Sequence, residues 1–346
     1  MRKAEGTSIM KTSFMRSLFG AAAMALALTG YAEAETITVY TAYEEDEAQA
    51  FLAEAKKALP DIDVQMLRLS TGDLAARIIA ESDNPQHDVL WGFAVTSMVN
   101  PKILEGLEAY APKGIEAIPA RFRDADNKWF AVTGYMAAFC VNTERLASKG
   151  LKMPTSWADL TDPSYKGEVV MPNPASSGTG YIQIDSLLQL MGEEKGWAFL
   201  GELDKNIAQY IKSGSKPCNT TAAGEYTIGA SFALRAVKNI DEGYPLAMVI
   251  PSEGAGNELE ANGLVAASKN KDAAKRFLDW TVSQEAANAY FQWKAIVTIP
   301  GGTMPEKFTK AGMPADVASI LFPVDFMAAA SERTRIIEEW QKKFER

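Results

Sequence analysis

Small hydroxyl residues and glycines occur together at two places in the chain, each just before a run with helical periodicity. The longer stretch is "SSGTG", residues 176–180, and the shorter is "STG", residues 70–72. At a helix start four backbone N–H groups lack helical partners, and the positive end of the helix dipole favours an anion. Glycine also lets a ligand approach the backbone closely. The two stretches therefore predict either helix caps or the two sides of one oxyanion site.

Capping is the local alternative, because Ser and Thr are common caps that contribute about 1 kcal/mol each. Residues 176–180 hold more hydroxyls and glycines than a cap needs, and a second such stretch in the other half of the chain strengthens the ligand interpretation. We therefore expect the anion to be held by the following residues: Ser70, Thr71, Ser176, Ser177, Gly178 and Thr179.

Further binding candidates follow from the rule that ligands of open α/β sheets lie beyond the carboxyl ends of strands. The rule selects Thr41, Tyr43 and Glu44 after the first expected strand, and Trp91 after the third. Glu44 would pair with a ligand cation, or else it only favours a helix start. Tyr43 or Trp91 would offer a ring face to that cation, or else each packs in the core.

The second half of the chain adds Tyr210 and Ser215, which lie around the loop before "KPC", and Arg235 in "SFALRA". Arg235 would add positive charge to the anion site, or it lies on a solvated helix face. Cys140 and Cys218 are the only cysteines, and they form a disulfide or remain two buried thiols. Together with one histidine they make no closed zinc site, so we expect neither a metal nor a cofactor.

Enzymatic motifs are missing from the sequence. It has no G-x-S-x-G elbow, Walker loop, HExxH or dinucleotide fingerprint. The single histidine, His87, lies at the start of an expected strand, and the ligand is expected at the opposite end of that strand. We therefore expect no enzymatic activity, and a hydrolase remains the remote alternative.

The N-terminal segment indicates the compartment of the protein, and the net charge excludes some classes of partner. Lys11 and Arg16 precede the apolar stretch 18–30, and Ala32-Glu33-Ala34 fits a cleavage site, which predicts an export signal cut after Ala34 and translation from Met10. The apolar stretch is too short to span a membrane. The net charge of −9 disfavours nucleic acid and anionic membranes as partners.

The hydrophobic pattern predicts alternating strands and helices, which is typical of a mostly parallel sheet covered on both faces. In the first part of the chain we expect strands at residues 36–41, 62–69 and 87–92, and helices at residues 44–59 and 70–82. Residues 129–143 then supply two more strands, and the pattern begins again from Pro154, so we expect a second α/β lobe. After Pro251 we expect mainly helices, of which the last, 327–345, packs back on the first lobe.

Several of these segments resemble one known family. The stretches "VYTAYE", "STGDLAARI", "NPQHDVLWG", "PTSWADLTDPSYKGEVVMPNPASSGTG" and "AAGEYTIGASFALRA" are similar to the periplasmic solute-binding proteins of ABC importers. Within that family they are most similar to the 2-aminoethylphosphonate-binding branch, which is related to the ferric-iron-binding receptors. The similarity covers residues 35–346. Iron-binding relatives carry adjacent tyrosines where this chain has Ala233 and Leu234, so the resemblance disfavours ferric iron.

The resemblance implies an α/β fold, the type II periplasmic-binding-protein clamshell, whose two lobes are joined by two hinge strands. We expect the signal peptide at 1–34, lobe 1 at 35–138 and 248–346, and lobe 2 at 139–247, with hinges near 137–142 and 246–250. The implied function is capture of 2-aminoethylphosphonate in the periplasm, by a monomer, for a permease in the inner membrane. Phosphate, a phosphate ester or another phosphonate are the alternative ligands, and ferric iron or a polyamine are less favoured.

Overall fold

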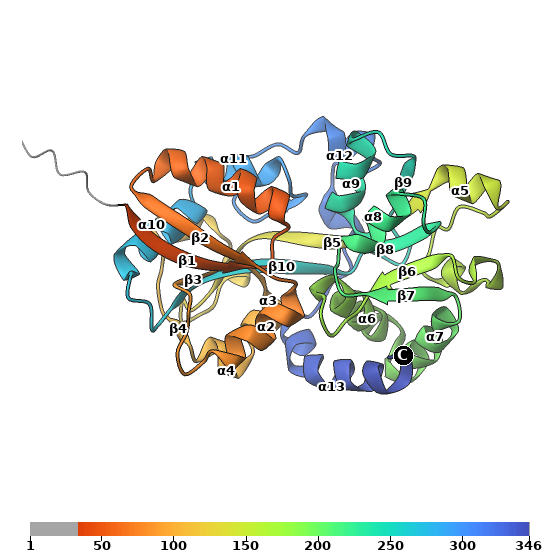
Figure 1. Cartoon of the computed structure of the whole chain (residues 1–346), viewed down its shortest axis with the longest axis horizontal. Helices are drawn as coiled ribbons and strands as arrows, with labels where there is room; N and C mark the ends of the chain where they lie inside the picture. The colour runs from red at the N-terminus through yellow and green to blue at the C-terminus, as the bar shows by residue number, and fades with distance from the viewer. Residues whose placement is uncertain (1–33, 346) are drawn as a thin grey trace, which may run out of the picture. The chain divides into compact units, whose positions relative to one another are not determined.

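The computed structural model describes residues 34–345, so the predicted export signal and the start at Met10 lie outside the described residues. The longer strands form one mixed sheet in the order β2-β1-β3-β10-β5-β8-β6-β7 (Figure 1). The strands are β1 Glu35–Thr41, β2 Ile62–Arg68, β3 Val89–Ala94, β4 Leu107–Glu108, β5 Phe130–Asn142, β6 Val169–Pro172, β7 Ile207–Ile211, β8 Ile228–Phe232, β9 Leu246–Val249, β10 Asn257–Val265 and β11 Ile296–Val297.

Helices cover both faces of this sheet (Figure 1). They are α1 Glu45–Ala58, α2 Thr71–Ala80, α3 Val95–Met98, α4 Pro101–Leu104, α5 Thr143–Ser148, α6 Gly178–Met191, α7 Glu193–Asp204, α8 Lys216–Ala222, α9 Ala233–Asp241, α10 Lys271–Thr281, α11 Gln284–Phe291, α12 Glu306–Lys310 and α13 Phe326–Phe344. Short 3-10 turns occur at Ile115–Ala117, Ala120–Phe122, Ala158–Thr161, Pro163–Tyr165 and Val317–Ile320.

Strand β5 runs through the whole sheet and divides it. Its residues up to Met136 pair antiparallel with β10, and its residues from Ala137 pair antiparallel with β8 and β9. We call β2, β1, β3 and β10 the first half of the sheet, and β8, β6, β7 and β9 the second half. The expectation of two strands in residues 129–143 is therefore wrong, because one unbroken strand serves both halves.

Strand β10 was not predicted, and it makes the sheet mixed rather than mostly parallel. It is antiparallel to both β3 and β5, and every one of its residues is buried. Its sequence "NELEANGLV" contains Glu258, Glu260 and Asn262, and such residues are uncommon in strands. Their side chains find partners inside the protein, as Asn262 accepts a hydrogen bond from the Gly92 N–H at 2.9 Å. Tertiary contacts thus override the sequence pattern at this strand.

Each half of the sheet has its own hydrophobic core. One core packs α1, α10 and α11 on the first half around Phe51, Trp91 and Tyr290. The other packs α6 and α7 on the second half around Tyr181 and Leu200, and it also includes Ala329, Ile336 and Trp340 of α13. The C-terminal helix was expected to pack on the first lobe, and it does contact α3 beside the first half of the sheet. Its apolar face also completes the core of the second half, where Trp340 lies beside the Tyr210 ring with centroids 4.8 Å apart.

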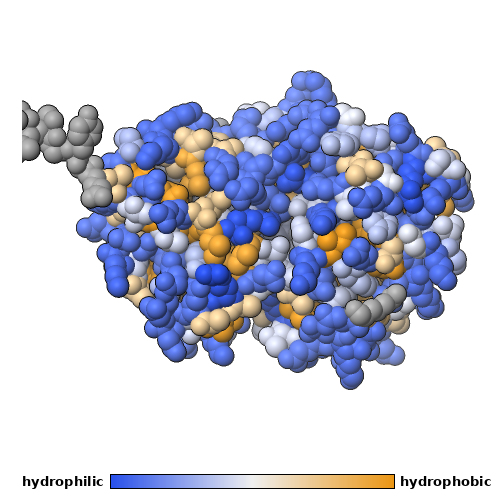
Figure 2. Space-filling view, in the orientation of Figure 1, coloured by the Kyte–Doolittle hydropathy of each residue, from blue (hydrophilic) through white to orange (hydrophobic). Residues whose placement is uncertain are grey.

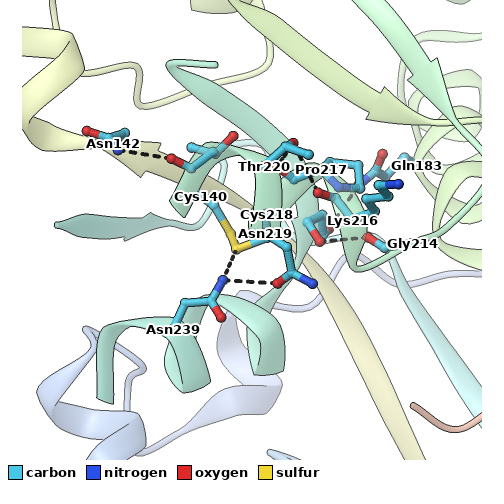
Figure 3. Close-up of a disulfide and its surroundings, with 12 residues drawn as sticks. Cys140, Asn142, Gln183, Gly214, Lys216, Pro217, Cys218, Asn219, Thr220 and Asn239 are labelled. Carbon is cyan, nitrogen blue, oxygen red and sulfur yellow. Dashed lines mark hydrogen bonds between the residues drawn. A yellow bond between two sulfur atoms is a disulfide. The ribbon is translucent and has the colours of Figure 1, made fainter. Parts of the chain in front are cut away.

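Cys140 and Cys218 are joined by a disulfide that fastens α8 to β5 (Figure 3). Both residues are fully buried. The Asn239 side chain in α9 donates a hydrogen bond to the Cys218 Sγ at 3.6 Å and another to the Asn219 Oδ1 at 3.2 Å. The disulfide and these hydrogen bonds therefore connect α8 with β5 and α9.

Loss of this disulfide is expected to lower the free energy of unfolding by about 4 kcal/mol, because it closes a long loop of the unfolded chain. The two cysteines are 78 residues apart in sequence. Urea unfolding of the double variant Cys140→Ala/Cys218→Ala measures the loss. Adding a reductant should destabilise the wild-type protein and leave the double variant unchanged. Equal midpoints for both proteins, with and without reductant, would refute the stabilising role.

His87 lies buried at the start of β3, where its ring stacks on Tyr40 with centroids 4.2 Å apart. Its Nδ1 atom has no hydrogen-bond partner within residues 34–345. Burial disfavours the charged imidazolium and lowers the pKa of His87 to about 4, although Glu81 and Asp88 oppose the shift. A structural role fits these contacts.

The depressed pKa makes His87 a source of acid instability. Between its unfolded pKa of 6.5 and its folded pKa of about 4, the unfolded chain binds a proton that the folded protein excludes, so stability falls as the pH falls. His87→Phe keeps the ring stack and cannot titrate. From pH ~7.5 to pH ~4.5, wild-type protein should lose about 2 to 3 kcal/mol more unfolding free energy than the variant. Equal losses in urea unfolding would contradict this prediction.

The face shown in Figure 2 is mainly hydrophilic, and its hydrophobic residues form small separate groups. The large hydrophobic side chains that stay exposed are Met153, Leu190, Tyr244 and Met327. Among residues 34–345, no helix combines the length and the apolar character that a membrane crossing requires.

Candidate functional site

A cavity lies where the two halves of the sheet meet at the carboxyl ends of their parallel strands. From the first half it is lined by Ala42 after β1, Ser70 after β2, and Gly92 in β3. From the second half come Ser177 after β6, Gly214 after β7, and Phe232 at the end of β8. The space between the lining atoms, with its opening, measures about 470 Å³.

Two helix starts meet in the lining of this cavity. Ser177 is the N-cap of α6, where its Oγ accepts a hydrogen bond from the Gly180 N–H at 3.3 Å. Ser70 is the N-cap of α2, yet its side chain makes no capping hydrogen bond. The Ser70 hydroxyl therefore does not serve the cap. Thr71 and Thr179 add their hydroxyls to the lining of the same cavity.

The two glycine-containing stretches touch directly. The Gly72 N–H donates a hydrogen bond to the Ser176 carbonyl at 2.8 Å. A Cβ at Gly72 would overlap the Ala175 carbonyl oxygen, and a Cβ at Gly178 would lie 2.7 Å from the Thr71 Oγ1. Only glycine permits this approach. The predicted convergence of residues 70–72 and 176–180 is therefore a feature of the structure.

Arg68 at the end of β2 brings a positive charge into the cavity lining. Its Nε donates to the Tyr43 carbonyl at 2.9 Å, and its Nη2 donates to the Glu44 Oε1 at 2.8 Å. No group within residues 34–345 accepts a hydrogen bond from its Nη1. The side chain is thus fixed in direction while one nitrogen stays available for a ligand.

Glu44 joins the two halves. Its Oε2 accepts a hydrogen bond from the Ser215 hydroxyl at 3.0 Å and lies 3.7 Å from an Arg235 nitrogen. Asp46 extends the connection, because it contacts both Arg235, at 3.3 Å, and Lys238. The pKa of Asp46 is lowered: burial alone would raise it, and the two cations outweigh burial. Ser215 and Arg235 therefore lie beside the cavity and contact its lining instead of forming it.

A second group of charged residues in the cavity lining is Glu47, Glu260 and Lys294, which we call the floor group. The Lys294 ammonium contacts the Glu47 carboxylate at 2.9 Å and the Glu260 Oε1 at 2.9 Å. All three residues line the cavity, and all three are nearly inaccessible. Burial raises the pKa of Glu47 to about 7, although Lys294 opposes the shift. Burial lowers the pKa of Lys294, but the two carboxylates raise it above its ordinary value.

Several predicted residues lie away from the cavity lining. Tyr43 and Trp91 are fully buried and pack edge to face, with ring centroids 5.0 Å apart, so neither offers a ring face to a ligand. Thr41 is fully buried and accepts a hydrogen bond from the Tyr43 N–H. The Ser176 hydroxyl donates to the Lys212 carbonyl at 3.0 Å, and Tyr210 hydrogen-bonds Asp204. Core packing explains the first three, and local contacts explain the others.

Sequence reasoning missed part of the lining. The missed residues with polar side chains are Glu47, Arg68, Tyr135, Glu260 and Lys294. Arg68 carried a signal, because it ends a strand just before Ser70. The others lie in a helix, two long strands and a loop without motif, so only the folded chain brings them together. Within the described part of the chain, no cluster of His, Cys, Asp and Glu is suited to hold a metal ion.

Comparisons with known proteins identify the family of this chain. A family model described as bacterial extracellular solute-binding protein matches residues 86–311. The probable ABC transporter periplasmic-binding protein y4fP of Sinorhizobium fredii is 30% identical, over 99% of this chain and 93% of its own. The solved structure of the periplasmic binding protein AfuA from Actinobacillus pleuropneumoniae, with fructose-6-phosphate bound, is 31% identical with a TM-score of 0.83. That match covers 90% of this chain and 98% of AfuA.

A ferric binding protein from Campylobacter jejuni has a similar fold, with a TM-score of 0.72 at 19% identity, covering 89% of this chain and 99% of that one. At this identity the likeness concerns the fold alone.

Proposed function

This chain belongs to the bacterial extracellular solute-binding proteins, and on that premise we propose that it captures a small phosphate or phosphonate in the periplasm for an ABC importer. The family membership and the TM-score of 0.83 confirm the predicted α/β periplasmic-binding-protein fold. The family consists of binding proteins, which also confirms the expectation of a protein that is not an enzyme.

One observation carries the choice of ligand class. The starts of α2 and α6 converge on one cavity with the hydroxyls of Ser70, Thr71 and Thr179, and Arg68 adds a cation. Free helical N–H groups, hydroxyls and a guanidinium are together the donors that a tetrahedral oxyanion accepts. A phosphorus group held there would neutralise the positive end of the cavity.

The specific ligand that we propose is 2-aminoethylphosphonate. The cavity supports a ligand with an anionic end and a cationic end, because the carboxylates of Glu47 and Glu260 line it together with the two helix starts. A phosphate ester with hydroxyl groups is the second candidate. It is favoured by the same carboxylates, which accept hydrogen bonds from hydroxyls, and by the relative AfuA, whose structure holds fructose-6-phosphate.

Capture involves no covalent chemistry in this proposal. We propose that the two halves of the sheet separate to admit the ligand and close on it, and that a membrane permease distinguishes the two forms. The hinges would lie near residues 137–142 and 246–250. We retain lobe 1 at 35–138 and 248–346 and lobe 2 at 139–247, and the C-terminal helix α13 connects them because it contacts α3 and the core of the second half.

Calorimetry with the purified protein tests the ligand class. The panel is 2-aminoethylphosphonate, glycerol 3-phosphate, inorganic phosphate, thiamine and ferric citrate. We expect at least one phosphorus compound to bind and to raise the melting temperature, since a hundredfold excess over Kd stabilises the folded state by about 2.7 kcal/mol. Binding of thiamine or ferric citrate alone would refute the proposal.

A further inference from the structure

Glu44 was the sequence-based candidate for the cationic end of the ligand, but its carboxylate is fully engaged. The Oε1 atom accepts a hydrogen bond from Arg68 at 2.8 Å. The Oε2 atom accepts one from Ser215 at 3.0 Å, and Arg235 lies 3.7 Å from it. A ligand ammonium here would face two guanidinium groups. Glu44 is therefore better suited to hold Arg68 in place than to bind a cation.

The carboxylates of Glu47 and Glu260 have the opposite character. They share one ammonium, that of Lys294, so the three side chains carry one net negative charge when all are ionised. The Lys294 Nζ also lies 4.6 Å above the Tyr43 ring centroid, which further fixes its position. One negative charge of the group is therefore not neutralised within these three residues.

Both carboxylate oxygens of Glu47 contact the Lys294 ammonium. The Glu47 Oε1 accepts hydrogen bonds from the Glu44 N–H at 2.8 Å and from Lys294 at 3.0 Å. The Glu47 Oε2 lies 2.9 Å from the Lys294 Nζ and accepts no further hydrogen bond within residues 34–345, although Glu47 lines the cavity. A carboxylate oxygen with one such contact keeps a lone pair free, so it can also accept a hydrogen bond from a ligand donor.

Glu260 is held in position by its second oxygen. Its Oε2 accepts a hydrogen bond from the Thr133 hydroxyl at 2.7 Å, and Thr133 in turn contacts the Tyr43 hydroxyl at 2.7 Å. Because these contacts lie in the core of the first half, the carboxylate cannot turn away from the cavity. The floor group is therefore a preorganised acceptor, whereas the helix starts are preorganised donors.

We propose that Glu47 and Glu260, with Lys294 between them, bind the end of the ligand remote from phosphorus, so that the protein selects compounds carrying an ammonium or a hydroxyl. This inference rests on the proposed function, because the phosphorus group must occupy the helix starts. It assigns to Glu44 a positioning role for Arg68. It also defines the ligand class as short phosphates or phosphonates that bear a hydrogen-bond donor.

Two matched ligand pairs test this selection by calorimetry. They are 2-aminoethylphosphonate against propylphosphonate, and glycerol 3-phosphate against propyl phosphate. In each pair the second compound has a similar length and lacks the donor. We expect the donor-bearing member of at least one pair to bind about 30-fold tighter or more, since a site built for a donor rejects an analogue without one. Affinities within about threefold in both pairs would overturn the inference and leave the proposed function standing.

Two variants then locate the selection. Glu47→Gln should reduce the ratio within the pair to about threefold, whereas Glu44→Gln should weaken both members equally and keep the ratio. The reverse pattern would overturn the inference and return the role to Glu44. If Glu47→Gln does not fold, the same affinity ratio is measured with Glu260→Gln. If neither variant folds, the matched ligand pairs on the wild-type protein still decide whether the protein selects a donor. If no phosphorus compound binds the wild-type protein, the proposed function itself fails.

Discussion

Arg68→Met is expected to weaken binding of the phosphorus ligand by about 100-fold, because it removes a charge-assisted hydrogen bond of about 1.5 to 3 kcal/mol from the anion. The variant also removes the 2.8 Å partner of Glu44 in the cavity lining, so the Glu44 carboxylate is less neutralised and repels the bound anion more strongly. Calorimetry with the tightest ligand of the panel measures the effect.

Arg276→Met is the matched control. Arg276 pairs with Asp61 at 2.7 Å on the surface, with both side chains over 40% exposed, and it does not line the cavity. Its loss should leave the ligand affinity within about twofold, because an exposed ion pair contributes little. An Arg68→Met affinity within threefold of the wild-type value would remove Arg68 from the site.

Gly72→Ala is expected to reduce ligand affinity by more than about 100-fold while the protein still folds. An added Cβ would overlap the Ala175 carbonyl oxygen and lie 2.8 Å from the Ser176 Cα, so the two stretches could no longer meet. Backbone atoms cannot move aside as a flexible side chain can. The ligand would then contact one helix start at a time and lose the donors of the other.

The control for this substitution is Gly201→Ala in α7, where an added Cβ meets nothing within 4 Å. Both variants place alanine in a helix, which alone favours folding by about 0.5 to 1 kcal/mol. In the open form proposed above the two stretches lie apart, so thermal unfolding without ligand should show both variants at least as stable as the wild type. If Gly72→Ala binds the ligand with unchanged affinity, or does not fold, the prediction is wrong. The contact between Gly72 and residues 175–176 would then not be one that forms on ligand capture.

Local chemistry made part of this architecture predictable. Residues 70–72 and 176–180 were recognisable because caps and anion sites need the same small hydroxyl residues, and each stretch follows a strand with a clear apolar pattern. Strand β1 was expected at 36–41 and lies at Glu35–Thr41. Strand-to-helix alternation therefore identified the fold class.

The rest depended on contacts between distant residues. Lys294 and Glu47 are 247 residues apart, and nothing local marks either as part of a buried group. Strand β10 was missed because Glu258 and Glu260 are residues uncommon in strands, and only the fold supplies their hydrogen-bond partners. Tyr43 and Trp91 show the converse: aromatic residues at strand ends suit either a ligand or a core, and here the first core includes both.

The position of the bound phosphorus tests the central proposal most directly. A crystal structure with the tightest ligand of the panel should place the phosphorus oxygens within hydrogen-bond distance of the N–H groups of residues 178 and 179, of the Ser70 or Thr71 hydroxyl, and of Arg68. The remote end should then face Glu47 and Glu260. A phosphorus group lying against Glu47 and Lys294 instead, or outside this cavity, would contradict the proposal.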